Sequence, residues 1–266
     1  MRAVTLIGSE SQFSRRAAFF HTEILIRRDA GIAEPRDLKG KRVGVPEYQQ
    51  TAAMWSRGIL QHEFGVAPSD MEFWMERTPE ISHSGAGGFE PPKGVTIHQI
   101  QADKNIGSMM VNDELDATLL YLTDRNLVDR SRVDLLAHAQ VRRLFDPRDE
   151  GARYCRKTRI FPINHLTVVR RSLFERNPWI ALNVLEAFRK GNALLTAERL
   201  GHLAYYIDTG TIPDETAEAV RRELVEYGVS ANRHVLETAA KYSHEQGLTP
   251  RRLAVSELFA PATLDV

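Results

Sequence analysis

Residues 37–52 read DLKGKRVGVPEYQQTA and place a short strand directly before a helix. The run Arg42–Val45 is typical of a short buried strand, and Pro46 ends it because proline cannot donate to a sheet ladder. From Gln50 to Phe64 the apolar residues recur at helical spacing, and Gly65 is suited to cap the helix C-terminus. The stretch therefore predicts a strand followed at once by a helix, the repeating unit of an α/β fold.

The junction between this strand and helix holds the polar side chains of Tyr48, Gln49, Gln50 and Thr51. Helix N-termini present free N–H groups and a positive dipole end, and in doubly wound folds ligands collect at such junctions. The pattern indicates an anion site, with simple capping by Gln50 or Thr51 as the alternative. Arg57 is expected to point off the apolar face of the helix, either to bind a carboxylate or as a solvated charge.

The same alternation continues through most of the chain. Strand-like segments lie at residues 3–7, 24–26, 71–75, 95–100, 116–120, 141–145 and 165–169, with helices expected at 103–111 and, solvated, at 147–157. After residue 170 three helices are expected, and the first carries an apolar face that includes Ala181, Leu185 and Leu195. We therefore predict two α/β lobes around a hinged cleft, residues 1–40 and 166–266 forming lobe one and residues 41–165 forming the inserted lobe two.

Composition excludes several classes of protein. The chain has 266 residues, with 35 Lys and Arg balanced by 35 Asp and Glu, so it lacks the basic excess of a nucleic-acid binder. Its single cysteine, Cys155, cannot form an intramolecular disulfide, and we interpret it as a bystander thiol. No uncharged stretch is long enough for a membrane helix, and the first residues lack a signal-peptide pattern. We expect a cytoplasmic protein with no membrane partner.

Several stretches resemble the 4,5-dihydroxyphthalate decarboxylase family, whose members are relatives of substrate-binding proteins. The most specific are Pro46-Glu47-Tyr48-Gln49 and Trp55-Ser56-Arg57-Gly58. Further matches are Arg143-Leu144-Phe145, Phe161-Pro162-Ile163-Asn164-His165, Asn177-Pro178-Trp179, Asn232-Arg233, Glu245-Gln246-Gly247-Leu248 and Glu257-Leu258-Phe259-Ala260. The resemblance runs in order from about residue 19 onward. It implies a type II periplasmic-binding-protein-like fold and removal of CO2 from a hydroxylated aromatic carboxylate, 4,5-dihydroxyphthalate or a close analogue, giving protocatechuate in the first case.

The sequence also departs from the pattern of that family. Its members usually carry a further α/β segment before the point where this sequence starts, so we expect lobe one to be incomplete at its N-terminus or completed by another subunit in a homo-oligomer. Phe20 precedes His21 where the family has an arginine. Asn164 precedes His165 where the family more often has methionine. Both changes fall near the expected site.

The implied reaction requires a base, an acid and groups that orient carboxylates, and it requires no metal or organic cofactor. His21 and His165 suit the proton-transfer roles because the histidine pKa lies near neutrality, with a buried histidine bonded to backbone as the alternative. The candidates for binding the small aromatic carboxylate are Arg16, Tyr48, Gln49, Thr51, Arg57, Arg125 and Asn164. For each arginine a solvated surface charge is the alternative.

Three readings of the function remain open. The first is a cofactor-independent carboxy-lyase. The second is a non-catalytic substrate-binding protein that closes around a small anion, because the same fold serves both. A third reading is a paralogue without activity. The sequence has no His-Glu-x-x-His motif, no cysteine pair and no glycine pattern for a nucleotide, so we expect neither a metal nor a nucleotide cofactor.

Overall fold

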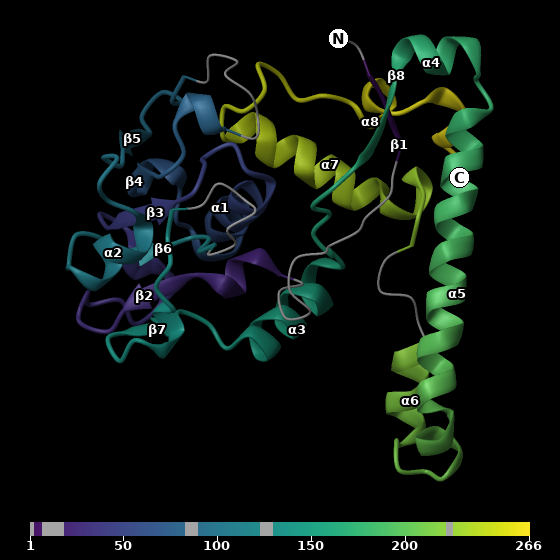
Figure 1. Cartoon of the computed structure of the whole chain (residues 1–266), viewed down its shortest axis with the longest axis horizontal. Coiled ribbons are helices and arrows are strands. Elements are labelled where there is room, and N and C mark those ends of the chain that lie inside the picture. The colour runs from purple at the N-terminus through teal and green to yellow at the C-terminus, as the bar shows by residue number, and fades with distance from the viewer. Residues whose placement is uncertain (1–2, 7–18, 83–89, 123–129, 222–225) are drawn as a thin grey trace. The chain divides into compact units, whose positions relative to one another are not determined.

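The computed structural model describes residues 3–6, 19–82, 90–122, 130–221 and 226–266 (Figure 1). Contacts between Cα atoms divide the chain into two units. We call Phe13–Pro162 with Thr238–Arg252 the sheet unit, and Met1–Gln12, Ile163–Glu237 and Leu253–Val266 the helical unit.

The sheet unit is built on a six-stranded mixed sheet in the order β5-β4-β3-β6-β2-β7. Its strands are β2 (Leu25–Arg27), β3 (Arg42–Val45), β4 (Glu72–Met75), β5 (Thr96–Gln99), β6 (Ala117–Thr118) and β7 (Val141–Arg143). Strands β5, β4, β3 and β6 pair in parallel, whereas β2 pairs antiparallel with both β6 and β7. The parallel pairs require crossovers, which include helices α1 (Thr51–Phe64) and α2 (Ile106–Val111).

The core of the sheet unit lies around β3 and α1. Val43, Val45 and Phe73 are fully buried, as expected for strands covered on both faces. Helix α1 begins one residue after the predicted start and ends at Gly65, whose φ of 70° is the left-handed conformation that glycine adopts most easily. Residues 52 to 60 of α1 are all buried. The middle of the helix is therefore enclosed on every side, whereas its last turn is partly exposed.

Helix α3 (Pro147–Thr158) differs from the solvated helix that the sequence predicted. Its start is as expected, because Asp146 accepts hydrogen bonds from the backbone N–H groups of Arg148 and Asp149. The helix buries Glu150 and Tyr154 against the 3-10 turn η1 (Phe20–Glu23). The prediction failed because charged residues form ion pairs on the inner face of this helix. Four more 3-10 turns of the sheet unit are η2 (Pro35–Leu38), η3 (Pro68–Asp70), η4 (Pro79–Ile81) and η5 (Leu135–Ala137).

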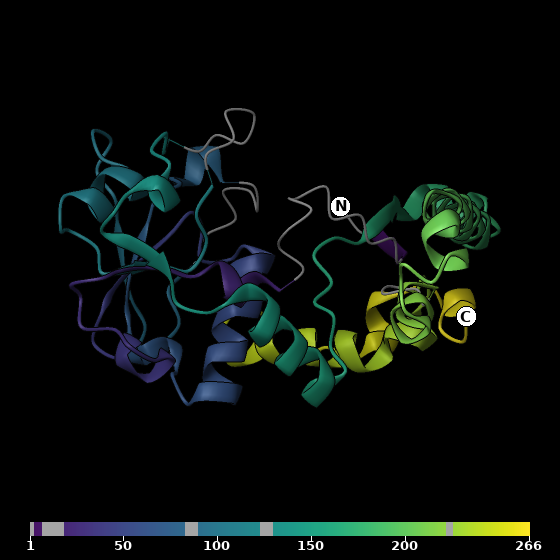
Figure 2. The same cartoon turned by 90° about the horizontal axis from the view of Figure 1, so that it is seen from below.

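The helical unit contains a two-stranded antiparallel pair, β1 (Ala3–Leu6) with β8 (Thr167–Arg170). Its helices are α4 (Arg171–Arg176), α5 (Ile180–Asp208), α6 (Asp214–Arg221), α8 (Val255–Leu258) and the first part of α7 (Val229–Glu245), followed by the turn η6 (Pro261–Thr263). Helix α7 begins in this unit and ends in the sheet unit. Figure 1 shows the short α6 beside one end of α5, and Figure 2 shows α5 nearly along its axis.

Helix α5 is long and mostly exposed. Of its described side chains only Ala181 and Leu185 are buried, and Ala181 joins a small core around Val169. Leu195 is 65% exposed, so the apolar face does not continue to this residue as the sequence predicted. The reason is that α5 packs on short elements, β1, α6 and η6, and extends beyond the contacts that they supply.

The predicted α/β class is confirmed, while the division of the chain differs from the predicted lobes. Residues 19–40 belong with the sheet because β2 pairs with β6 and β7. Residues 238–252 also join the sheet unit because Tyr242 packs on α1. The hinged cleft stays a prediction. Within the described ranges, no helix combines the length and apolar character that crossing a membrane requires.

Candidate functional site

The carboxyl ends of β3 and β4 carry an unusual concentration of buried polar groups. Glu47 follows β3, and Arg77 follows β4. Arg77 Nη1 lies 3.3 Å from Glu47 Oε2, and both side chains are almost fully buried. Ser82 donates a hydrogen bond to the same carboxylate. Sequence reasoning missed this pair, although its position directly after two parallel strands was the signal that could have revealed it.

Arg57 lies beneath the junction between β3 and α1 and is 0% exposed. Its Nη2 donates to the carbonyl oxygen of Tyr48 at 2.6 Å, and its Nε donates to Gln246 Oε1 at 2.9 Å. The guanidinium carbon lies 3.7 Å from the centroid of the Tyr48 ring, within the range of a cation–π contact. The prediction that Arg57 points away from the apolar face was wrong, because residues 238–252 cover that side of α1.

This guanidinium lacks a matching negative charge. Among the described residues no carboxylate pairs with Arg57, and its Nη1 makes no hydrogen bond. Burial lowers the pKa of Arg57 to about 10, so the group is still a cation at neutral pH. A buried, unpaired charge is costly unless something compensates it. Arg57 therefore adds positive potential beside the positive N-terminal end of the 14-residue helix α1.

The other predicted residues of the junction have different environments. The Tyr48 ring is fully buried in the core of the sheet unit, where it meets Phe73 edge-on. Gln50 precedes α1 but makes no side-chain capping hydrogen bond, which leaves the capping alternative unsupported for this residue. The Oε1 atoms of Gln49 and Gln50 are buried and accept no hydrogen bond from the described residues. Thr51 is half-buried as the first residue of the helix.

His21 occupies η1, which packs on both α1 and α3. The side chain is 0% exposed, and its Nε2 lies 2.9 Å from Glu150 Oε1. The rings of Phe145 and Tyr154 stand edge-on to the imidazole at centroid distances of 5.5 and 5.2 Å. Its Nδ1 is buried and makes no hydrogen bond to a described residue. His21 is therefore a buried histidine, as the alternative expected, but its hydrogen-bond partner is a carboxylate and not a backbone group.

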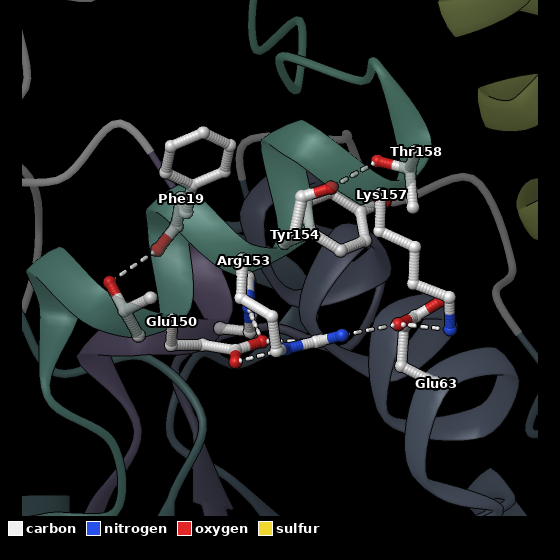
Figure 3. Close-up of polar contacts among 9 residues, drawn as sticks. Phe19, Glu63, Glu150, Arg153, Tyr154, Lys157 and Thr158 are labelled. Atoms are coloured by element: carbon white, nitrogen blue, oxygen red, sulfur yellow. Dashed lines mark hydrogen bonds and ion pairs between the residues drawn. The ribbon is translucent and has the colours of Figure 1, made fainter.

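Glu150 belongs to a chain of ion pairs that links α3 to α1 (Figure 3). Arg153 grips the carboxylate of Glu150 with Nε at 2.6 Å and Nη2 at 2.8 Å. Arg153 Nη1 and Lys157 Nζ both reach Glu63 Oε2, at 2.9 and 3.0 Å. Burial alone would raise the pKa of Glu150, but the hydrogen bonds from Arg153 and His21 outweigh it and lower the pKa to about 2. Glu150 is thus an anion at neutral pH.

Two further predicted residues, Asn164 and His165, belong to the helical unit, whereas this network lies in the sheet unit. His165 is exposed and Asn164 is half-buried in the segment before β8, which begins at Thr167 rather than at His165. The Nδ2 atom of Asn164 lies 3.3 and 3.4 Å from the two ring nitrogens of His165. Exposure excludes the core-histidine alternative for His165. These two residues belong to the helical unit and His21 to the sheet unit, so their joint action stays a prediction.

Two predicted residues, Arg16 and Arg125, lie outside the described residues. Within the described residues, no three His, Cys, Asp or Glu side chains gather as metal ligands would. Cys155 is a partly exposed free thiol on α3. The candidate site is therefore the α1 N-terminus with Arg57, the adjoining Glu47–Arg77 pair, and the His21–Glu150 pair.

Known proteins are similar to this chain along most of its length. Residues 18–198 match the model of the NMT1/THI5 like family. A 4,5-dihydroxyphthalate decarboxylase from Comamonas testosteroni is 32% identical over 252 residues, covering 93% of this chain and 74% of that protein. A second protein of the same name, from Pseudomonas putida, is 37% identical over 102 residues, covering 38% of this chain and 40% of its own. The chain belongs to the NMT1/THI5 like family. With these relatives it also belongs to the 4,5-dihydroxyphthalate decarboxylase family, which is the family that its sequence predicted.

Two solved structures align with nearly the whole of this chain. The periplasmic aliphatic sulphonate binding protein SsuA from Escherichia coli aligns with 97% of this chain and 68% of its own length. The TM-score is 0.49 at 17% identity. The desulfurization enzyme DSZB aligns with 99% of this chain and 76% of its own, with a TM-score of 0.42 at 16% identity.

Proposed function

We propose that this protein is a cofactor-independent carboxy-lyase that removes CO2 from a hydroxylated, phthalate-like aromatic carboxylate. The observation that carries the proposal is the 32% identity over 93% of the chain to a 4,5-dihydroxyphthalate decarboxylase. The specific reaction proposed is conversion of 4,5-dihydroxyphthalate into protocatechuate, or the corresponding loss of CO2 from a close analogue. The α1 N-terminus with Arg57 and the His21–Glu150 pair support it, because they supply positive potential for a carboxylate and a proton carrier.

The reaction follows from the electronic structure of the substrate. A base removes the proton from the hydroxyl group para to one carboxylate, which enriches the ring in electrons. An acid then protonates the ring carbon that bears this carboxylate. The bond between that carbon and the carboxylate breaks, its electron pair returns to the ring, and CO2 leaves. His21 and His165 are the proposed proton carriers, since imidazole can serve either role near neutral pH.

The substrate also carries two carboxylates that must be held. We assign one of them to the α1 N-terminus, where the helix dipole and the buried Arg57 both favour an anion. Gln49 lies in the junction between β3 and α1, and Thr51 is the first residue of α1. A carboxylate held there needs no metal ion, because positive potential is already built into the protein.

The direct test is turnover by the purified full chain. CO2 release and protocatechuate formation would be measured with 4,5-dihydroxyphthalate. Calorimetry with phthalate, which lacks the hydroxyl groups, would report binding separately from chemistry. We expect turnover of the hydroxylated acid and binding of both, with Kd values in the micromolar to millimolar range as a rough expectation.

The outcomes separate the competing functions. Binding of both acids without CO2 release would favour the substrate-binding protein that the fold also allows. Neither binding nor turnover, from protein shown to be folded by circular dichroism, would count against the whole substrate class. A variant Arg57→Met, in which the buried charge is removed, should weaken phthalate binding if the carboxylate is held at the α1 N-terminus.

A further inference from the structure

The contact between His21 and Glu150 decides which nitrogen of His21 carries a proton. Nε2 lies 2.9 Å from Glu150 Oε1, within hydrogen-bond distance. An ionised carboxylate can only accept hydrogen bonds. The nitrogen that faces it must therefore be the donor. In the neutral imidazole, which has a single N–H, the proton then sits on Nε2 and Nδ1 keeps a lone pair.

This lone pair accepts no hydrogen bond from the described residues. Nδ1 of His21 is buried and makes no hydrogen bond to any described residue. Leaving a buried acceptor unsatisfied lowers stability, and native proteins seldom keep such atoms without a reason. A basic nitrogen without a protein partner can act as a general base for a substrate hydroxyl that comes within hydrogen-bond reach of it.

The geometry is held by several independent contacts. Arg153 binds both oxygens of Glu150 in a fork arrangement, which fixes the plane of the carboxylate. Arg153 is itself tied to Glu63 on α1. The edge-on ring of Phe145 restricts rotation of the imidazole. The two partners are 129 residues apart in sequence, so only folding brings them together.

We propose that Glu150 is the positioning residue of His21: it holds the ring in the Nε2–H tautomer and so reserves Nδ1 as the base that accepts the phenolic proton of the hydroxylated aromatic acid. This inference rests on the proposed carboxy-lyase function and adds a residue and an atom to it. In the step concerned, the O–H bond of the substrate breaks, the proton passes to the Nδ1 lone pair, and the electron pair stays on oxygen as the phenolate. His21 becomes an imidazolium whose charge Glu150 stabilises.

The first measurement is independent of activity. Long-range proton–nitrogen NMR correlations of histidine-labelled full chain distinguish the two tautomers, and His21→Gln identifies the His21 signals. We expect the pattern of an Nε2–H tautomer in wild type. Glu150→Leu should replace it with a mixture of tautomers, whereas Glu150→Gln, whose amide oxygen can still accept, should largely retain it.

The second measurement is kinetic. With 4,5-dihydroxyphthalate, Glu150→Leu should lower kcat by about 10²-fold or more while KM changes by less than about threefold, because the substrate is still held but the base is misoriented. Glu150→Gln should restore part of kcat. Glu245→Gln is the matched control, because His62 and Glu245 form another histidine–carboxylate pair, at 2.6 Å on the outer side of α1. This control should leave the His21 signals and kcat unchanged.

Each outcome bears on a separate claim. An Nδ1–H tautomer in wild type, or an unchanged tautomer in Glu150→Leu, would overturn the positioning role. Normal kcat in a Glu150→Leu variant with mixed tautomers would overturn the assignment of Nδ1 as the base. If wild type releases no CO2, the proposed function and the base role fail together, while the NMR result still decides whether Glu150 fixes the tautomer.

Discussion

The sheet unit and the helical unit use apolar helices in opposite ways. Helix α1 has 14 residues and is buried through its whole middle, including the cation Arg57. Helix α5 has 29 residues and buries only Ala181 and Leu185 among its described side chains. The sequences of α1 and α5 both consist largely of residues that are common in helices. The helical pattern thus determines that a helix forms, whereas the elements packed around it determine which of its side chains are buried.

The two candidate histidines follow the same contrast. His21 is enclosed in the sheet unit and bound to Glu150, while His165 is exposed in the helical unit. A buried side chain couples function to stability, because removing it also breaks packing and hydrogen bonds. An exposed side chain can serve a ligand with little effect on folding.

The largest effect is expected from the histidines themselves. His21→Gln and His165→Gln should each lower kcat for CO2 release by about 10²–10⁴-fold, because each removes a proton carrier. Their stabilities should differ. His21→Gln should lower Tm, since it removes a partner of the buried Glu150, while His165→Gln should change the free energy of unfolding by less than about 0.5 kcal/mol. Activity assays beside thermal unfolding would check both, and full turnover in His165→Gln would remove His165 from the reaction.

The next effect compares two leucines. Leu60 on α1 is 0% exposed, so Leu60→Ala should lower the free energy of unfolding by about 2–5 kcal/mol through lost burial and a cavity. Leu194 on α5 is 73% exposed, and Leu194→Ala should change stability by less than about 0.5 kcal/mol. Urea titration measures both. A large loss in Leu194→Ala would mean that a partner covers α5 in solution.

Acid should act on the sheet unit through Glu150. Its folded-state pKa of about 2 is below the ordinary value of 4.5, so the stabilisation is present above about pH 4.5 and is lost as pH falls towards 2. The contribution is at most roughly 3 kcal/mol. Glu150→Gln should therefore be less stable than wild type at pH 7, and the difference should shrink between pH 4.5 and pH 2. Thermal unfolding at a series of pH values would test this, and a difference that does not depend on pH would contradict it.

The smallest effects come from matched glycines and should have opposite signs. A Cβ on Gly58 would lie 2.1 Å from the Tyr242 ring, so Gly58→Ala should cost about 1–3 kcal/mol of stability. A Cβ on Gly191 of α5 would meet nothing within 4 Å, so Gly191→Ala should gain up to about 1 kcal/mol from helix propensity. Chemical denaturation of the two variants gives the signs. A gain in both would show that Tyr242 does not pack on α1 as described.

Much of the fold was accessible to sequence reasoning because its signals are local. The strand Arg42–Val45, the helix to Phe64 and its cap at Gly65 agree with the structure to within one residue. The cap depends only on the freedom of glycine to adopt positive φ. Other strands are shorter in the structure than the sequence predicted, as at β6 (Ala117–Thr118). The reason is that strand length depends on the neighbouring strand that supplies hydrogen bonds.

The candidate site was predicted less completely. The junction after β3 and the choice of His21 came from the sequence, since helix N-termini and histidine have intrinsic chemical preferences. Glu150 and Arg77 were missed because their partners are distant in the chain, His21 by 129 residues and Glu47 by 30. A charged residue in a helix pattern is read as solvated unless its partner is known.

By itself, the sequence determined the α/β class, the strand-to-helix junction at residues 42–64 and the family. These follow from backbone preferences and from motifs that are contiguous in the chain. Only the tertiary structure decided that β2 joins the six-stranded sheet, that Arg57 is buried beneath Tyr48, and that His21 meets Glu150. The reason is physical: burial and charge pairing are properties of the space around a side chain, and that space is filled by segments far away in sequence.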